Sequence, residues 1–433
     1  MSDTTARSEK SVDAKPPQPQ EPPSRPAGGP SPPPNGGTMA WLNVLGSFML
    51  YFNTWGILNT FGAYQTYYES GALFTASSSD ISWVGSIAAF MLLFVGLFVG
   101  PIYDRGFLRT LLIVGGFMVV FGHMMLSLCK TFWQVLLAQG FVVGIGTGCL
   151  FVPCVAIIPQ YFSTKMGMAM GIAASGSALG GVIYPVVLYR LINEIGFPWA
   201  VRVIGFIALG TLLIPLSVMK LRVKPPKVRA MLDPTAFTDA GYMAFILTSL
   251  VAYMGLFVIL FYLSYYSAAE RITDESLAFY LVTIFNAASV FGRTIPNKMA
   301  DKLGPFNLLV PASLLSGMLM LVMMAVHSKG AIIVMALLSG FMSGALIGLP
   351  PMCLAMLTKD KSRLGTRVGM GYAIIALGVL ISGPSSGAIL RTGGDSLNWH
   401  SLWTFGGVPT CAAGLLYAVI RVAKYGPRLA IKA

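Results

Sequence analysis

The chain has 433 residues; 55% belong to the set A, V, I, L, M, F, W, Y and C, and 10% are charged. An ordinary globular domain carries about 25% charged residues, so this composition excludes a water-soluble protein and indicates an integral membrane protein. The net charge of +13 comes from cations scattered between apolar runs, which excludes the clustered basic patch of a nucleic-acid-binding protein.

The first 38 residues differ from the rest of the chain. Ten of the 27 prolines lie between Pro16 and Pro34, among Ser, Gln, Gly and charged residues. Such a segment buries too little apolar area to offset the entropy of ordering it. We expect residues 1–38 to form a disordered cytoplasmic tail, without the layout of a cleaved signal peptide.

From Trp41 onward, long apolar runs alternate with short polar breaks. A helix needs about 20 apolar residues to cross a bilayer. The pattern therefore predicts an all-α membrane protein with twelve transmembrane helices and no strands. The predicted helices are 41–62, 81–103, 107–128, 132–157, 165–192, 199–222, 241–265, 277–299, 306–326, 331–357, 364–391 and 401–422.

The cations predict the orientation of these helices. With both termini in the cytoplasm, 23 of the 29 lysines and arginines fall on the inner side, as the positive-inside rule requires. The predicted domains are the tail 1–38, an N-terminal six-helix bundle 39–222, a cytoplasmic central loop 223–240, a C-terminal six-helix bundle 241–424 and a cytoplasmic C-terminal tail 425–433. We expect a multi-pass protein of the cell membrane.

An internal repeat supports the division into two halves. Gly140, Gly144 and Gly148 recur at an offset of 200 residues as Gly340, Gly344 and Gly348. Met170-Gly171 and Met370-Gly371 recur at the same offset. Two parallel six-helix repeats predict the major facilitator architecture.

The break between the second and third predicted helices holds a candidate gating loop with Gly100, Asp104, Arg105 and Arg109. An acidic side chain here can pair with a cation or a helix N-terminus at a cytoplasmic gate. A degenerate copy, with Asp301, follows the eighth predicted helix. The alternative interpretation is a charged turn that merely follows the positive-inside rule.

Polar residues inside predicted membrane helices indicate a substrate pathway, because they are costly unless paired or facing water. Arg293 lies eight residues before Asp301, about 12 Å along a helix, and so near mid-membrane. The alternative for Arg293 is that its guanidinium reaches back to the inner surface. The other predicted pathway residues are Asn53, Asn59, Gln139, Tyr184 and Asn286.

No catalytic or cofactor motif occurs in the sequence. A GxxxxGK[ST] phosphate loop and an HExxH motif are both absent, and the five cysteines show no metal-ligand spacing. We therefore expect a protein that is not an enzyme and that binds neither metal nor cofactor.

Two further motifs resemble the monocarboxylate porter family of the major facilitator superfamily, in its fungal branch. The segment Pro34–Trp41, with Gly36, Gly37 and Trp41, is similar to the PDGG-x-x-x-W motif of that family. A second segment, with Tyr161, Phe162, Lys165, Gly171 and Gly176, is similar to its motif before the fifth helix. The gating loop resembles the superfamily's G-x-x-x-D-R-x-G-R-x signature, with the final Gly-Arg displaced.

The resemblance implies a secondary transporter that works by alternating access on a small organic solute, a monocarboxylate or a secondary metabolite. Arg293 matches an arginine of animal relatives that is implicated in proton-coupled transport, but Ser289 and Asn59 replace the accompanying aspartate and lysine, and Asn35 replaces the aspartate of PDGG. These departures favour efflux, with the solute and the bilayer as partners and protons as a candidate coupling ion. The alternatives are an uptake carrier for a monocarboxylate or vitamin-like solute, and a non-transporting receptor.

Overall fold

The computed structural model describes residues 33–222, 228–358, 360, 363–393 and 396–427, without the side chain of Asp301. Most of the predicted tail, Lys224 and Lys227 of the central loop, and Lys359 and Lys361 lie outside the described residues. The described part is helical and holds no strand, as predicted.

The N-terminal half runs from residue 38 to 218. Its elements are α1 (Thr38–Asn53), α2 (Trp55–Asn59), α3 (Phe61–Glu69), α4 (Ser78–Asp104), α5 (Leu108–Leu126), α6 (Phe132–Val135), the π-helical η1 (Leu136–Val143), α7 (Gly144–Ala156), the 3-10 turn η2 (Ile158–Gln160) and α8 (Met166–Val218).

The C-terminal half runs from residue 240 to 425, after a linker that contains α9 (Pro234–Thr238). Its elements are α10 (Ala240–Ala269), α11 (Glu275–Leu303), α12 (Pro305–Val322), the 3-10 turn η3 (Met323–Ala325), α13 (Lys329–Gly348), α14 (Pro350–Leu357), α15 (Leu364–Leu390), the 3-10 turn η5 (Arg391–Gly393) and α16 (Trp399–Tyr425).

The helices begin where polar residues interrupt the apolar runs. Ser77 and Asp80 form a capping box at the start of α4, and Asp274 accepts the backbone N–H of Leu277 at the start of α11. Asn398 caps α16 in the same way through Ser401. These side chains satisfy N–H groups that have no partner within the helix.

Ten helices in the described part are long and apolar enough to cross a membrane. One of them, α8, holds two predicted spans, because Gly196 has a φ of 80° in its middle and Pro198 follows; glycine adopts such a φ at little cost. The first predicted span is divided among α1, α2 and α3. The twelve predicted spans are thus all represented.

The glycine repeat found in the sequence is also a structural repeat. A Cβ on Gly144 would lie 3.0 Å from the Cα of Ala88 on α4, and a Cβ on Gly344 would lie 3.0 Å from the backbone N of Arg293 on α11. In each half the same glycine-lined helix therefore packs closely against its partner, which supports the two-bundle architecture.

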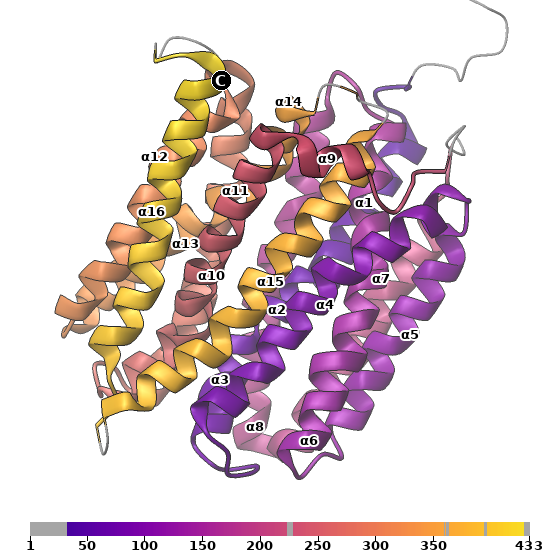
Figure 1. Ribbon diagram of the computed structural model, residues 1–433. Helices are drawn as coiled ribbons and strands as arrows, with labels where there is room; N and C mark the ends of the chain where they lie inside the picture. Colours follow the sequence, from indigo (N-terminus) through magenta and orange to yellow (C-terminus); the bar gives the residue numbers. More distant parts are fainter. Residues whose placement is uncertain (1–32, 223–227, 359, 361–362, 394–395, 428–433) are drawn as a thin grey trace, which may run out of the picture. The chain divides into compact units, whose positions relative to one another are not determined.

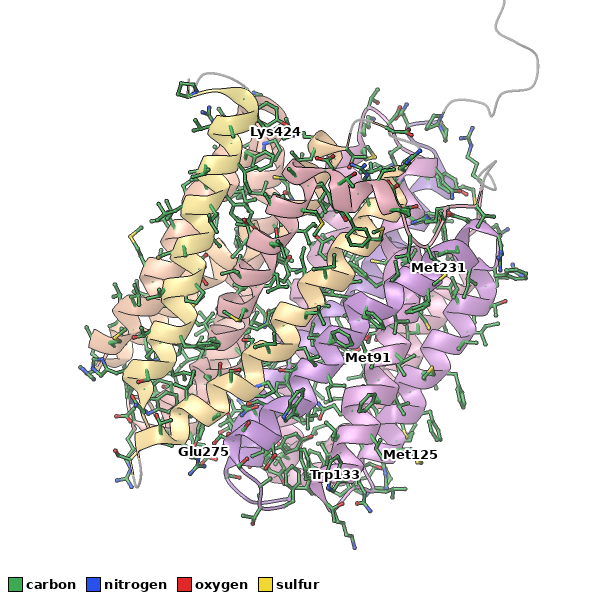
Figure 2. All side chains as sticks on the ribbon, in the orientation of Figure 1. Met91, Met125, Trp133, Met231, Glu275 and Lys424 are labelled. Atoms are coloured by element: carbon green, nitrogen blue, oxygen red, sulfur yellow. The ribbon has the colours of Figure 1, made fainter. Side chains whose placement is uncertain are left out.

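The two halves meet along three helix pairs, α4 with α15, α8 with α11, and α3 with α10 (Figure 1 shows α4 beside α15). The linker with α9 and the end of α16 lie at one end of the helices, and the α3 and α6 region lies at the other. We call the end with residues 229–239 the linker face and the end with residues 69–78, 391–393 and 396–399 the distal face. Figure 2 shows Met231 and Lys424 toward the first, and Met125 and Trp133 toward the second.

Candidate functional site

Arg293 lies on α11 at the interface between the two halves. Its residue exposure is 5%, and its Nη1 donates a hydrogen bond to the hydroxyl of Ser177 on α8. The guanidinium carbon is 5.9 Å from the centre of the Trp55 ring on α2. Arg293 is therefore buried and contacts the N-terminal half.

The Arg293 guanidinium has no acidic partner among the described residues. None of the ion pairs in that part of the chain includes it, and its buried Nε has no hydrogen-bond partner. A buried charge is costly unless it is paired. The site therefore favours a ligand that brings a negative charge or a polar oxygen.

Aromatic side chains surround this cation. Tyr51 on α1 and Tyr253 on α10 lie close enough to interact with it electrostatically, and Tyr372 on α15 adjoins Tyr253. Together with Trp55, these rings come from both halves. The environment is thus apolar and aromatic around a single positive charge, which suits an amphipathic acid.

The first span breaks next to Arg293. Thr54 leaves helical geometry with φ −96° and ψ −81°, and its hydroxyl bonds back to the carbonyl of Leu50 at 2.9 Å. A Cβ on Gly56 would lie 2.8 Å from the Cα of Gly180 on α8. The break and the close approach together place Trp55 over the guanidinium, and broken membrane helices are typical of transporter binding sites.

Three predicted pathway residues are satisfied by other side chains. The Tyr184 hydroxyl donates to Asn53 Oδ1 at 2.8 Å, and Asn53 Nδ2 donates to Thr211 at 2.9 Å. The Tyr68 hydroxyl donates to Gln139 Oε1 at 2.8 Å within the π-helical segment. These contacts lie within the N-terminal half and can stabilise it without a solute.

The other three pathway residues keep a buried polar atom without a partner. These atoms are Asn59 Nδ2, Asn286 Oδ1 and Arg293 Nε. Asn286 also donates to the carbonyl of Gly181 on α8 at 3.1 Å, across the two halves. Such atoms need a ligand or water, so Asn59, Asn286 and Arg293 are the stronger pathway candidates.

The gating loop binds the linker. Asp104, at the end of α4, accepts Arg229 Nε at 2.6 Å and Arg229 Nη2 at 2.7 Å, a bidentate pair. A Cβ on Gly100 would lie 3.2 Å from Arg229 Cδ, so this glycine leaves room for the arginine. Arg105 and Arg109 are exposed and form no ion pair within the described ranges. The side chain of Asp301 lies outside them.

A second ion-pair cluster fastens the linker to α15. Asp233 accepts Arg367 Nε and Arg363 Nη1, each at 3.0 Å, and Arg367 Nη1 also binds Asp239 at 3.0 Å. The hydrogen bond from the Thr235 hydroxyl, together with the two arginines, lowers the pKa of Asp233 to about 2 despite its burial. Burial alone would raise the pKa of Asp239, but the Tyr242 N–H and Arg367 outweigh it and lower that pKa.

The two family motifs contact each other. Asn35, with a φ of 55°, accepts the N–H groups of Ser163 and Thr164 at 2.6 and 2.8 Å, and its own N–H donates to the Tyr161 carbonyl at 3.0 Å. Trp41 packs edge-on against Phe162 with ring centres 5.2 Å apart. Residues 33–37 are thereby held against the segment before α8.

The remaining motif residues have separate roles. Gly36 and Gly171 have no atom within 4 Å of an added Cβ, and Gly37 has a φ of 91° where α1 begins. Lys165 is exposed at the start of α8. Gly176 packs against the carbonyl of Phe48.

Several residues of the site were not predicted. Ser177 directly follows Gly176 of the second family motif, but Ser177, Trp55, Tyr51 and Tyr253 are common residue types in membrane helices, so the sequence does not predict them as pathway residues. Arg229 was counted only among the cations of the central loop. Its position 125 residues from Asp104 gave no local signal, although an acid in a gating loop requires some cationic partner.

No group of three or more His, Cys, Asp or Glu side chains in the described part could hold a metal ion. Two comparisons with known proteins identify the family of the chain. A family model described as Major Facilitator Superfamily matches residues 40–327 and 245–433. The two overlapping matches together cover nearly the whole chain.

Fungal transporters are similar over most of the chain. The MFS-type transporter dbaD of Emericella nidulans is 64% identical over 385 residues, which are 89% of this chain and 86% of the relative. The Aspyridones efflux protein apdF of the same species is 37% identical, over 88% of this chain and 79% of the relative. The Fujikurins efflux protein of Gibberella fujikuroi is 36% identical, over 88% of this chain and 82% of the relative.

Proposed function

The chain belongs to the Major Facilitator Superfamily, and from this premise we propose that it exports an acidic, amphipathic product of secondary metabolism across the plasma membrane. As a member of that superfamily it is a multi-pass membrane transporter of small molecules and not an enzyme. The relatives named as efflux proteins support export as the direction.

Within the superfamily, we assign the chain to the fungal branch of the monocarboxylate porters. The support is the contact between the two motifs that suggested this branch, since Asn35 binds the segment Tyr161–Thr164. The linker face is then cytoplasmic, because both termini and most cations are predicted on that side.

One observation carries the proposed substrate class: Arg293 is buried between the halves, and no acidic side chain in the described part of the chain pairs with it. No aspartate or glutamate occurs in the middle of a predicted span, so the solute itself would supply the negative charge. Tyr51, Trp55 and Tyr253 would contact its apolar part, and Asn59 and Asn286 would bind its polar groups. Alternating access would then expose this site to each side in turn.

Arg293→Ala tests the proposal. We expect export to fall about tenfold to a hundredfold, since a hydrogen-bonded charge contributes about 1.5–3 kcal/mol and each 1.4 kcal/mol is a factor of ten. Arg293→Lys should keep part of the activity. Secreted and retained metabolites would be measured in cells that carry each variant, with and without a pH gradient to test proton coupling.

Arg202 provides a matched control. It donates to the Ser127 hydroxyl at 3.0 Å and lies 4.7 Å over the Trp199 ring, the same kinds of contact as Arg293 makes, but all within the N-terminal half. Arg202→Ala should leave the solute preference unchanged. Equal export by wild type and Arg293→Ala would refute the substrate role, and accumulation of a supplied solute inside cells would indicate uptake.

A further inference from the structure

Glu69 ends α3 at the distal face, and its side chain is only 1% exposed. An acidic side chain at a loop boundary is ordinarily hydrated, because burial of a carboxylate is costly. Here Arg391 covers it, and the Arg391 side chain is 52% exposed. A buried carboxylate therefore lies directly beneath a surface arginine.

The contacts of Glu69 join the two halves. Its Oε1 accepts Gln65 Nε2 and its Oε2 accepts the Ser78 hydroxyl, each at 2.9 Å. Arg391, from the C-terminal half, places Nη2 3.6 Å from Oε2 and donates from Nε to the Ser78 hydroxyl at 3.1 Å. Glu69, Ser78 and Arg391 thus form one cluster across the interface.

Further hydrogen bonds continue inward from this cluster and again cross between the halves. Gln65 also donates to the Ser82 hydroxyl at 3.3 Å, and that hydroxyl bonds to the Tyr262 hydroxyl on α10. Ser79 donates to the Pro384 carbonyl on α15 at 2.9 Å. The distal ends of α3 and α4 are therefore held to α10 and α15 by polar contacts.

Polar contacts of this kind suit an interface at the distal face that must open and close repeatedly. When the halves part, Glu69 and Arg391 both regain water, so the attraction lost is largely returned as hydration. A purely apolar seal would gain no such compensation on opening. The pair can thus close the distal face without fixing the protein in one state.

We propose that Glu69 and Arg391 are positioning residues for transport and form the gate that closes the distal face over the Arg293 site. This inference rests on the proposed transport function, with the distal face outward. Glu69→Gln and Arg391→Gln should each open the gate more often and expose the space around Ser177 to the outside. Glu69→Gln nearly preserves side-chain size and so tests charge alone, whereas Arg391→Gln also shortens the side chain and removes its hydrogen bond to Ser78.

Labelling of Ser177→Cys with a membrane-impermeant thiol reagent, added outside, measures this exposure, and the chain with Ser at 177 gives the background of native cysteines. Each gate variant should be labelled roughly threefold to tenfold faster, the range of a partly shielded ion pair. The double variant should be no faster than either single variant, because one interaction is lost in all three. Labelling should be slower in the Glu69→Asp variant than in the Glu69→Gln variant.

Asp274→Asn is the matched control. Asp274 pairs with Lys329 at 3.3 Å on the distal face, but both residues belong to the C-terminal half. Asparagine also keeps the helix cap. This variant should be labelled at the wild-type rate.

Wild-type labelling of both Glu69→Gln and Arg391→Gln, in protein that reaches the cell surface in normal amount, would overturn the gate. Additive effects of the two substitutions would also overturn it. Labelling does not require a transported solute, so unchanged export in Arg293→Ala would refute the substrate site and leave the gate result standing. If Glu69→Gln fails to reach the surface, the mostly exposed Arg391 decides the test.

Discussion

Asp233 joins the linker to α15 through Arg363 and Arg367. It also accepts a hydrogen bond from the Thr235 hydroxyl within the linker. Its pKa of about 2 lies below the ordinary value of about 3.9 for an unfolded chain. A lowered folded-state pKa means that the carboxylate contributes stability above about pH 4, and that this contribution is lost as the pH falls from about 4 to 2. At neutral pH the Asp233 carboxylate is therefore ionised.

Asp233→Asn should lower the apparent melting temperature of the purified protein at pH 7. The difference between wild type and variant should stay constant from about pH 8 to pH 5 and shrink as the pH falls from about 4 to 2, because Asp233 becomes protonated over this range and is half protonated in the folded state at about pH 2. Thermal unfolding in detergent across this range measures it. A difference that persists undiminished at pH 2 would contradict the assigned pKa and its cause.

At the scale of single residues, the sequence predicts which side chains are unusual but not what they contact. Arg293 stands out in the sequence because a charge in mid-membrane is rare, and its exposure in the structure is 5%. Ser177 is 116 residues away in the chain and is an ordinary helix residue. Asn53 and Asn59 look alike in sequence, yet only Asn59 has a polar atom without a partner, a distinction that depends on tertiary packing.

At the scale of elements, close packing between α8 and the broken first span shapes the Arg293 site. A Cβ on Gly180 would lie 2.9 Å from the Cα of Gly56 and even closer to the carbonyl of Phe52. Backbone atoms cannot move aside as a flexible side chain can. Gly171, nine residues earlier on the same helix, faces open space instead.

Gly180→Ala should therefore destabilise the protein by about 1–3 kcal/mol, the usual cost of overpacking. Gly171→Ala should be neutral or slightly stabilising, because alanine favours a helix by about 1 kcal/mol over glycine. The amount of folded protein in the membrane and its apparent melting temperature report both effects. Equal tolerance of the two substitutions would show that α8 does not pack on α2 this closely.

Most predicted helix boundaries lie within a few residues of the observed ones, because most apolar runs and their helices end together. The first span is the exception: the apolar run ends at residue 62, whereas α3 continues to Glu69. Tyr64, Gln65 and Thr66 carry polar groups but are buried in the structure. Hydropathy averages both faces of a helix and cannot detect a polar face that another helix covers.

At the scale of the whole molecule, ion pairs fasten the linker face as well as the distal face. The Asp104 side chain is 4% exposed in its pair with Arg229, and Arg229 lies between Gly100 on α4 and Gly365 on α15. In alternating access the two faces must open in turn. The linker pair is positioned to oppose opening of the linker face.

Asp104→Asn should lower export about threefold to tenfold, because the linker face would close less firmly after loading. Arg105→Gln, a change in an exposed neighbour, should have little effect and serves as the control. Export from intact cells, normalised to the amount of transporter at the surface, measures both. Full export by Asp104→Asn would show that the Arg229 pair is not part of the transport cycle.

The distal cluster also bears on the order in which the protein is made. Arg391 and Ser78 are 313 residues apart in the chain, and synthesis at about 5–20 residues per second separates their emergence by about 15 to 60 s. Until then Glu69 has no cation from the C-terminal half and must remain hydrated at the membrane surface. The pairing of this carboxylate with Arg391 is consequently a late event of assembly, since it requires the C-terminal half.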